Sequence, residues 1–160
     1  MKKKKKTTSI YEAEARRTLE VVKYIEQSSR SVNKYDVYVS GSQLNSGLNR
    51  KTVTGYQIFH NGRSYMVNYT SMSDVSLPKM LLQTVVRASS EIPSGSYIKI
   101  HTADSFTHDF INNGWVGPKT KEEANMILEQ RKRQLCIHAE IGHSNILSDI
   151  TNKCRNMMYK

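Results

Sequence analysis

The dipeptide Asn61-Gly62 is the strongest local constraint in this sequence, because it favours a two-residue turn between two paired strands. Apolar and aromatic residues alternate with polar ones on both sides of it, over 53–60 and 64–70, as in strands with two different faces. A similar stretch over 35–41 precedes them and ends in the polar turn Ser40-Gly41-Ser42. The sequence therefore predicts three antiparallel strands, with 43–51 as a polar loop between the first two.

Helical patterns surround these strands. Ser9 and Glu12 have the spacing of a capping box, which predicts a helix over 9–30 with one apolar stripe. After the three strands, the pattern predicts helices over 78–90, 105–113, 119–133 and 145–158, and strands over 97–102 and 134–141. This order favours an α/β fold in which a mixed five-stranded sheet carries helices on its faces. We expect one domain over 34–160, an additional N-terminal amphipathic helix over 9–30, and a disordered basic tail over 1–8.

The charge of the chain points to an anionic partner. The 160 residues carry a net charge of +10, and residues 1–34 alone hold ten basic and four acidic side chains. Nucleic acid is the most common partner of such proteins, ahead of an anionic membrane. The alternative is that the charge serves solubility only.

The location follows from what the sequence lacks. No run of 18 apolar residues predicts a transmembrane helix, and no apolar segment of a secretory signal follows the N-terminal lysines. Two cysteines, Cys136 and Cys154, are too few for a disulfide framework, which favours a reducing, intracellular location. The Lys-, Asn- and Ser-rich composition is compatible with a viral or phage origin.

Six short motifs at the predicted element boundaries resemble those of the ribonuclease H-like superfamily, over about residues 35–158. They are Ser40-Gly41-Ser42 (Asp-Gly-Ser in the family), the hairpin at Asn61-Gly62, Thr102-Ala103-Asp104-Ser105 (Thr-Asp-Ser in the family), Asn113-Gly114-Trp115, Ile141-Gly142-His143-Ser144, and Asp149 in the last helix. The resemblance implies the mixed sheet described above and a nucleic-acid partner, with RNA preferred over DNA.

The resemblance also implies a degenerate catalytic site. The family uses four carboxylates to hold two divalent cations, and these positions fall on Ser40, near Pro78, on Asp104 and on Asp149. Serine is a weak ligand for Mg²⁺ and proline offers no ligand. We therefore expect a non-catalytic member with a remnant site at Ser40, Asp104 and Asp149, and with no metal or other cofactor. Alternatively, Asp104 caps a helix and Asp149 is an ordinary surface acid.

The candidate nucleic-acid contacts are basic side chains and one histidine: Lys2, Lys3, Lys4, Lys5, Lys6, Arg16, Arg17, Arg50, Lys51, Arg63, Lys79, Arg131, Lys132, Arg133 and His143. We expect Arg50, Lys51 and Arg63 in loops that flank the end of the first strand. The helix dipole alone also accounts for basic residues at 131–133. His143 either contacts phosphate or caps the last helix together with Ser144. The spacing of Cys136, His138, His143 and Cys154 matches no tight zinc motif.

These observations favour a non-catalytic protein that binds nucleic acid mostly through its backbone, independently of sequence. One alternative is a divergent metal-dependent nuclease or resolvase that uses Asp104, Asp149 and either Asp36 or Asp74. A second alternative is a structural adaptor, in which the apolar stripe of 9–28 dimerises the chain or binds a protein partner.

Overall fold

The computed structural model describes residues 9–27, 32–46 and 49–159, so the predicted tail and the predicted end of the first helix at 28–30 lie outside the described residues. The elements in chain order are α1 (Ile10–Gln27), β1 (Lys34–Ser46), β2 (Asn49–His60), β3 (Arg63–Ser73), α2 (Leu77–Ser90), β4 (Tyr97–Thr102), α3 (Ser105–Asn113), α4 (Lys121–Arg133), β5 (Cys136–Ile141) and α5 (Asn145–Met158). In this part of the chain, no helix has the length and apolar character needed to cross a membrane.

The five strands form one mixed sheet in the order β3-β2-β1-β4-β5. β1 pairs antiparallel with β2 and parallel with β4, and β5 extends the parallel half. The last paired position between β1 and β4 is Tyr38 opposite His101. Ser40 therefore stands two residues beyond this pairing, where β1 remains paired only with β2, opposite Gly55.

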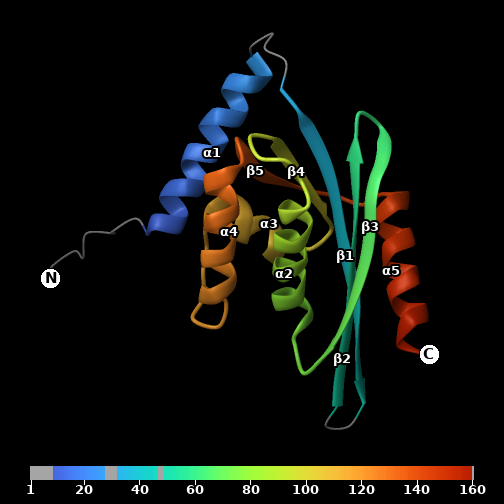
Figure 1. The fold of residues 1–160 in the computed structure, drawn as a ribbon. Helices are drawn as coiled ribbons and strands as arrows, with labels where there is room; N and C mark the ends of the chain where they lie inside the picture. The colour runs from blue at the N-terminus through green and yellow to red at the C-terminus, as the bar shows by residue number, and fades with distance from the viewer. Residues whose placement is uncertain (1–8, 28–31, 47–48, 160) are drawn as a thin grey trace, which may run out of the picture.

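Helices cover both faces of the sheet (Figure 1). On one face, alternate residues of β1 such as Val37 and Val39 pack with Val85 of α2 and Ile111 of α3 in a buried core. On the other face, α5 covers β1 and β2, and Ile150 and Cys154 pack against Val53. The alternation along β1 thus sends Ser40 toward α5, while its neighbours Val39 and Gly41 face the helices on the opposite side.

The N-terminal helix packs within the molecule. Ser9 accepts a hydrogen bond from the backbone N–H of Glu12 (3.2 Å), as expected for the capping box. Ala15, Thr18 and Val22 of α1 are buried, and the helix contacts α3 and β5. The apolar stripe is therefore largely used inside the chain, rather than left free for a partner.

The predicted loop over 43–51 is wrong. β1 continues to Ser46 and β2 starts at Asn49, so most of this polar segment is paired as a hairpin. The polar side chains mislead because they do structural work at the sheet surface. Gln43 accepts a hydrogen bond from the backbone N–H of Leu77 (2.8 Å) and so caps the first turn of α2 from outside the helix. The turn at Asn61-Gly62 is as expected, with positive φ at both residues.

Candidate functional site

Ser40 is satisfied within the protein. Its hydroxyl lies 2.6 Å from the hydroxyl of Thr151 on α5, and Thr151 donates to the backbone carbonyl of Leu147 (2.9 Å). Since the Thr151 proton is used for Leu147, the Ser40 hydroxyl donates to Thr151. The chain of hydroxyls closes the space between β1 and α5 at the place where the family resemblance puts a carboxylate.

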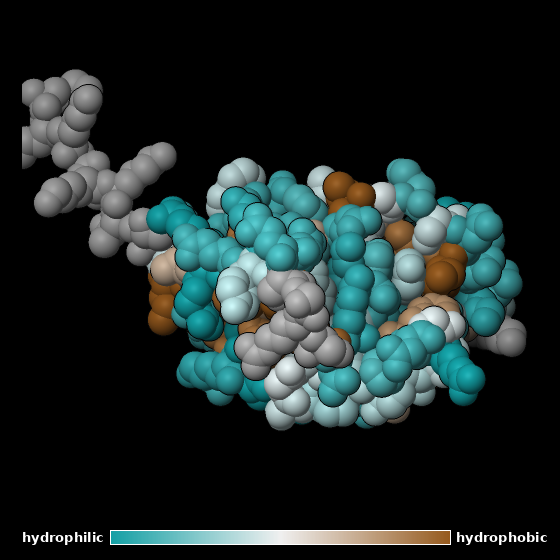
Figure 2. Space-filling model, turned by 90° about the horizontal axis from the view of Figure 1, so that it is seen from above, coloured by the Kyte–Doolittle hydropathy of each residue, from teal (hydrophilic) through white to brown (hydrophobic). Residues whose placement is uncertain are grey.

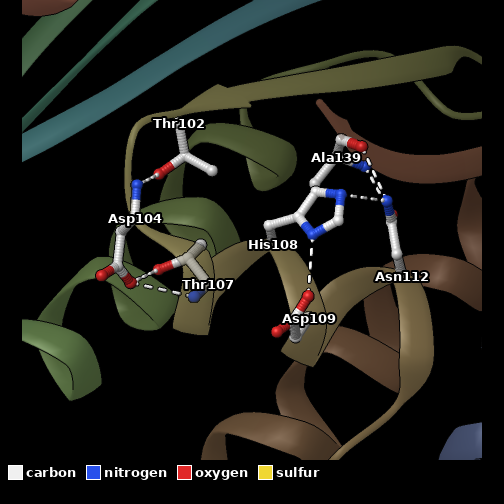
Figure 3. A network of polar contacts seen from close by, with 7 residues as sticks. All are labelled: Thr102, Asp104, Thr107, His108, Asp109, Asn112 and Ala139. Carbon is white, nitrogen blue, oxygen red and sulfur yellow. Dashed lines mark hydrogen bonds and ion pairs between the residues drawn. The ribbon is translucent and has the colours of Figure 1, made fainter. Parts of the chain in front are cut away.

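The two remaining acids of the remnant site do not join Ser40. Asp104 caps α3, because its carboxylate accepts from the backbone N–H (2.9 Å) and the hydroxyl (2.6 Å) of Thr107 (Figure 3). Asp149 is exposed on α5, two residues before Thr151, which turns it about 200° away around the helix. Burial raises the pKa of the Tyr69 hydroxyl on β3, and the negative charge of Asp149 also raises it.

The donor set does not fit a pair of divalent cations. Within the described ranges, no three His, Cys, Asp or Glu side chains are placed to hold a metal ion. At the start of α2, where the second family carboxylate would fall, Pro78 has no ligand and Leu77 lies against Gly41. Hydroxyls that already bond one another are poor replacements for carboxylates around Mg²⁺. We derive no metal chemistry at this position.

A pocket of about 190 Å³ opens beside the Ser40–Thr151 contact, and we call it the strand-end pocket. Its lining comes from the middle of β1, from the residues just after β4 and β5, and from one face of α5: Ser40, Ala103, His143, Ser144, Leu147, Ser148, Thr151, Asn152 and Arg155. No carboxylate belongs to this lining. Ser144, Ser148, Thr151 and Arg155 recur at spacings of four, three and four, so they form one polar stripe along α5.

A second, larger hollow of about 760 Å³ is lined by several basic side chains, and we call it the basic groove. Three cations, Arg50, Lys79 and Lys119, line it with a single acid, Asp74. The other lining residues are Val75, Ser76, Pro78, Phe106, Gly117, Pro118 and Thr120. The groove therefore joins the start of β2, the start of α2 and the loop before α4.

Two features fix the wall of the basic groove. Asp74 has a left-handed backbone (φ 63°), and its N–H donates to the carbonyl of Arg50 (2.9 Å), which ties the end of β3 to the start of β2. The ammonium of Lys79 lies 3.9 Å from Glu123, a carboxylate that is only 1% exposed and also accepts from Gln83. Lys79 thus balances a buried charge while its own side chain stays partly exposed at the groove.

The strand-end pocket and the basic groove are neighbours. Ala103 lines the pocket and Phe106 lines the groove, and only two residues lie between them in the chain. Their Cα atoms are thus at most about 11 Å apart. Phe106 is 39% exposed, so an aromatic side chain stands near the junction of two cationic hollows.

Three predicted contacts are corrected by their position. Arg131 is only 7% exposed, and it donates to the hydroxyl of Thr18 (2.6 Å) and to the carbonyls of Ile137 (2.8 Å) and Ile111. Arg133 donates to two carbonyls at the end of α2. Arg63 starts β3 opposite His60, at the end of the sheet where β1 begins, rather than beside the end of β1.

The remaining predicted residues divide between the site and the rest of the surface. Arg50 and Lys79 line the basic groove, and His143 lines the strand-end pocket. The others lie outside both hollows: Lys51 on β2, Arg16 and Arg17 on α1, and Lys132 on α4, where Lys132 pairs with Glu129 (2.9 Å). Lys2, Lys3, Lys4, Lys5 and Lys6 lie outside the described residues.

Sequence reasoning missed Lys119, Phe106, Ser148 and Arg155. The polar stripe of α5 was the available signal, since its spacing is visible in the sequence. Lys119 and Phe106 gave no comparable signal. They reach the groove because the start of α3, which carries Phe106, and the loop before α4, which carries Lys119, both come to the start of α2, and these contacts are not local in the chain.

The zinc set is not assembled. Cys136 packs with Val22 and Tyr97, whereas Cys154 of α5 packs against Val53 on a different part of the sheet. His138 lies beside Lys99 on β4, and burial, with the Lys99 charge, lowers its pKa to about 4. Its Nδ1 atom is buried and has no hydrogen-bond partner among the described residues.

Solved structures resemble this chain, although no family model and no curated protein match its sequence. The N-terminal RNase H domain of Rv2228c from Mycobacterium tuberculosis aligns with a TM-score of 0.67 at 8% identity, over 81% of this chain and 97% of that one. RNase H1 from Halobacterium salinarum aligns with 0.64 at 8% identity, over 78% and 98%. LC11-RNase H1, in complex with an RNA/DNA hybrid, aligns with 0.61 at 9% identity, over 79% and 99%.

The chain has a ribonuclease H-like fold. The expected mixed five-stranded sheet, with its helices and the extra N-terminal helix, is confirmed. In this ribonuclease H-like fold, the strand-end pocket lies beside α5, where β4 and β5 end and where β1 passes beyond its pairing with β4. The identities of 8–9% establish the fold, and the chemistry must be argued from the side chains.

Proposed function

We propose that this protein binds the phosphate backbone of nucleic acid, prefers RNA over DNA, and does not cleave the nucleic acid that it binds. The observation that carries the proposal is the basic groove, where Arg50, Lys79 and Lys119 meet with one acid on a ribonuclease H-like fold. Converging cations in a hollow attract a polyanion and release its counterions, without reading the base sequence. Phe106 at the edge of the groove offers a surface on which a base can stack.

The chemistry at the strand ends supports binding without hydrolysis. Two-metal hydrolysis requires carboxylates that hold the cations beside the scissile phosphate. Here Ser40 bonds to Thr151, Asp104 caps α3, and Asp149 points to another side of α5. Asp36 is also engaged, because it pairs with His101 at 2.8 Å and this hydrogen bond lowers the pKa of its carboxyl.

The preference for RNA rests on resemblance. LC11-RNase H1, which shares the fold, was solved with an RNA/DNA hybrid. We extend this to the present chain as a ranking of ligands, in which RNA and hybrid bind more tightly than DNA of the same sequence.

A salt-dependent binding assay tests the groove. Fluorescence anisotropy with labelled 20-nucleotide RNA, DNA and hybrid, at several salt concentrations near 100 mM, gives both the affinity and the salt slope. The double variant Arg50→Ala/Lys119→Ala removes two groove cations that are fully on the surface and spares Lys79, whose charge balances Glu123. For single-stranded RNA, we expect the salt slope to become shallower by about 1.4, from about 0.7 for each lost phosphate contact.

The matched control is Lys23→Ala/Lys132→Ala, which removes the same charge from exposed positions outside the groove. We expect this variant to keep nearly the wild-type slope. Equal losses in the two double variants would mean that net charge, rather than the groove, governs binding. No measurable affinity of the wild type for any of the three ligands at ~100 mM salt would refute the proposed function.

A cleavage assay separates this proposal from a divergent nuclease. Wild-type protein incubated with labelled RNA, DNA and hybrid, with Mg²⁺ or Mn²⁺, is expected to leave all three intact. Cleavage that disappears in Asp104→Asn would overturn the non-catalytic proposal.

Light scattering of the full chain addresses the adaptor alternative, which the inward packing of Ala15 and Val22 already disfavours. The face of the molecule seen in Figure 2 is mainly hydrophilic, with hydrophobic residues in small separate groups.

A further inference from the structure

The strand-end pocket has the chemistry of an anion site. In the resembled family this position binds cations, which requires acceptor oxygens with negative charge. In the present chain, the lining offers a guanidinium (Arg155), an imidazole (His143), a hydroxyl (Ser148) and an amide (Asn152), without any carboxylate in its described lining. These groups donate hydrogen bonds, and Arg155 carries positive charge at neutral pH.

We propose that the strand-end pocket binds a phosphate group of nucleic acid directly, with Arg155 as its main ligand and without a metal ion. This inference rests on the proposed function for the identity of the polymer. It goes further by assigning a second phosphate site and by exchanging the family's cation chemistry for anion chemistry.

The floor of the pocket needs no ligand of its own. Ser40 donates to Thr151, and Thr151 donates to Leu147, so both hydroxyl protons are already used. The walls are different, because the side chains of Ser148, Asn152 and Arg155 are exposed and make no hydrogen bond or ion pair within the described part of the chain. A cluster of unpartnered donors over a satisfied floor is suited to a ligand that supplies acceptors.

The size of the pocket fits one phosphate group. Water occupies roughly 30 Å³ in the liquid, so the pocket of about 190 Å³ has room for roughly six waters. This volume accommodates a phosphate with its oxygens, but not a nucleoside as well. The base and sugar must therefore extend outside the strand-end pocket.

The acid in the adjoining hollow does not oppose an anion. An adjoining hollow of about 230 Å³ shares His143 and Ser144 with the strand-end pocket, and it contains Glu140. Glu140 is held by Lys99 at 2.6 Å, which also lowers the pKa of its carboxyl, so its charge is balanced on the sheet. The positive charge of Arg155 is left for the ligand.

The test compares the RNA affinity of two variants, each of which loses one basic side chain of α5. Arg155→Gln and Lys153→Gln each remove one exposed positive charge from α5, but only Arg155 lines the pocket. In anisotropy with single-stranded RNA and with EDTA present, we expect a five- to tenfold loss for Arg155→Gln and less than twofold for Lys153→Gln. A second pair of variants introduces a negative charge instead of removing a positive one. Ser148→Asp inside the pocket should weaken RNA binding more than Asn156→Asp outside it.

A titration with inorganic phosphate, against chloride at the same ionic strength, reads the pocket without RNA. We expect phosphate-specific NMR shifts at Ser148, Asn152 and Arg155 in the wild type, and their loss in Arg155→Gln. Equal RNA losses in the Arg155 and Lys153 variants, phosphate shifts identical to those of chloride, or abolition of binding by EDTA would each overturn the inference. If RNA does not bind but phosphate shifts the pocket, the proposed function fails and the anion site stands; if RNA binds and the pocket is silent, the reverse holds.

Discussion

The charge of Arg131 suggests a surface contact, whereas its buried position gives it a structural role. Replacing Arg131 therefore tests whether the side chain stabilises the fold. Its guanidinium is 7% exposed and donates to three oxygens: the hydroxyl of Thr18, the carbonyl of Ile137 and the carbonyl of Ile111. These acceptors belong to α1, β5 and α3. A single side chain of α4 therefore holds together three elements that are far apart in the sequence.

The expected cost of removing it follows from these contacts. Arg131→Met keeps much of the apolar stem and leaves three acceptors without a donor, each costing roughly 1 kcal/mol or more. Burial lowers the pKa of Arg131 to about 10, so the native side chain is charged at pH 7 and its desolvation offsets part of the gain. We expect a net loss of about 3 kcal/mol in the free energy of unfolding.

Urea denaturation followed by circular dichroism measures this loss. With a slope of about 2 kcal/mol per molar urea, the midpoint should fall by about 1.5 M. Lys132→Ala is the matched control, since Lys132 is the next residue and its side chain is 72% exposed, and we expect a change within about 0.5 kcal/mol. A loss below about 1 kcal/mol for Arg131→Met, or an unchanged stability with a selective loss of RNA affinity, would refute the structural assignment.

Three further predictions follow from single positions. Burial holds the pKa of His138 at about 4, below its unfolded value near 6.5, so the unfolded state takes up a proton first as the pH falls. The free energy of unfolding should therefore decrease by roughly 1–3 kcal/mol between pH 6.5 and pH 4. Measuring the stability difference between wild type and His138→Phe across this range tests the prediction, and a difference that does not depend on pH contradicts it. Ser40→Asp should not produce cleavage with Mg²⁺, because Thr151 rather than a second carboxylate faces it, and any hydrolysis would contradict this expectation. Asn112 bonds both the N–H and the carbonyl of Ala139 (2.7 Å each) at the free edge of β5 (Figure 3), so Asn112→Ala should lower stability by about 2 kcal/mol and speed hydrogen exchange at the Ala139 amide, whereas unchanged exchange would exclude this role.

The sequence was most informative about order and local geometry. Alternation over 35–41 and the turn at Asn61-Gly62 identify strands because side-chain direction and turn conformation depend on immediate neighbours. The same reasoning failed over 43–51. There the backbone N–H of Leu77, at the start of α2, donates a hydrogen bond to Gln43 and helps to keep a polar segment in the sheet. That contact joins residues 34 positions apart.

The candidate site divides in the same way. The resemblance to the ribonuclease H-like superfamily implied that Ser40 stands where that family has a carboxylate, and the sequence predicted a strand end there, whereas β1 continues to Ser46. Which side chains surround Ser40 depended on the rotation of α5, which turns Ser148, Thr151 and Arg155 toward it and Asp149 away.

The amino-acid sequence by itself determined the ribonuclease H-like succession of strands and helices, since each element is specified by short-range periodicity and caps. The tertiary structure alone decided the role of each charge. Arg131 is drawn inside by carbonyls of Ile111 and Ile137, and Arg50 meets Lys119 across about seventy residues of chain. A charge is buried or exposed according to the partners that folding brings to it, and those partners are not its neighbours in sequence.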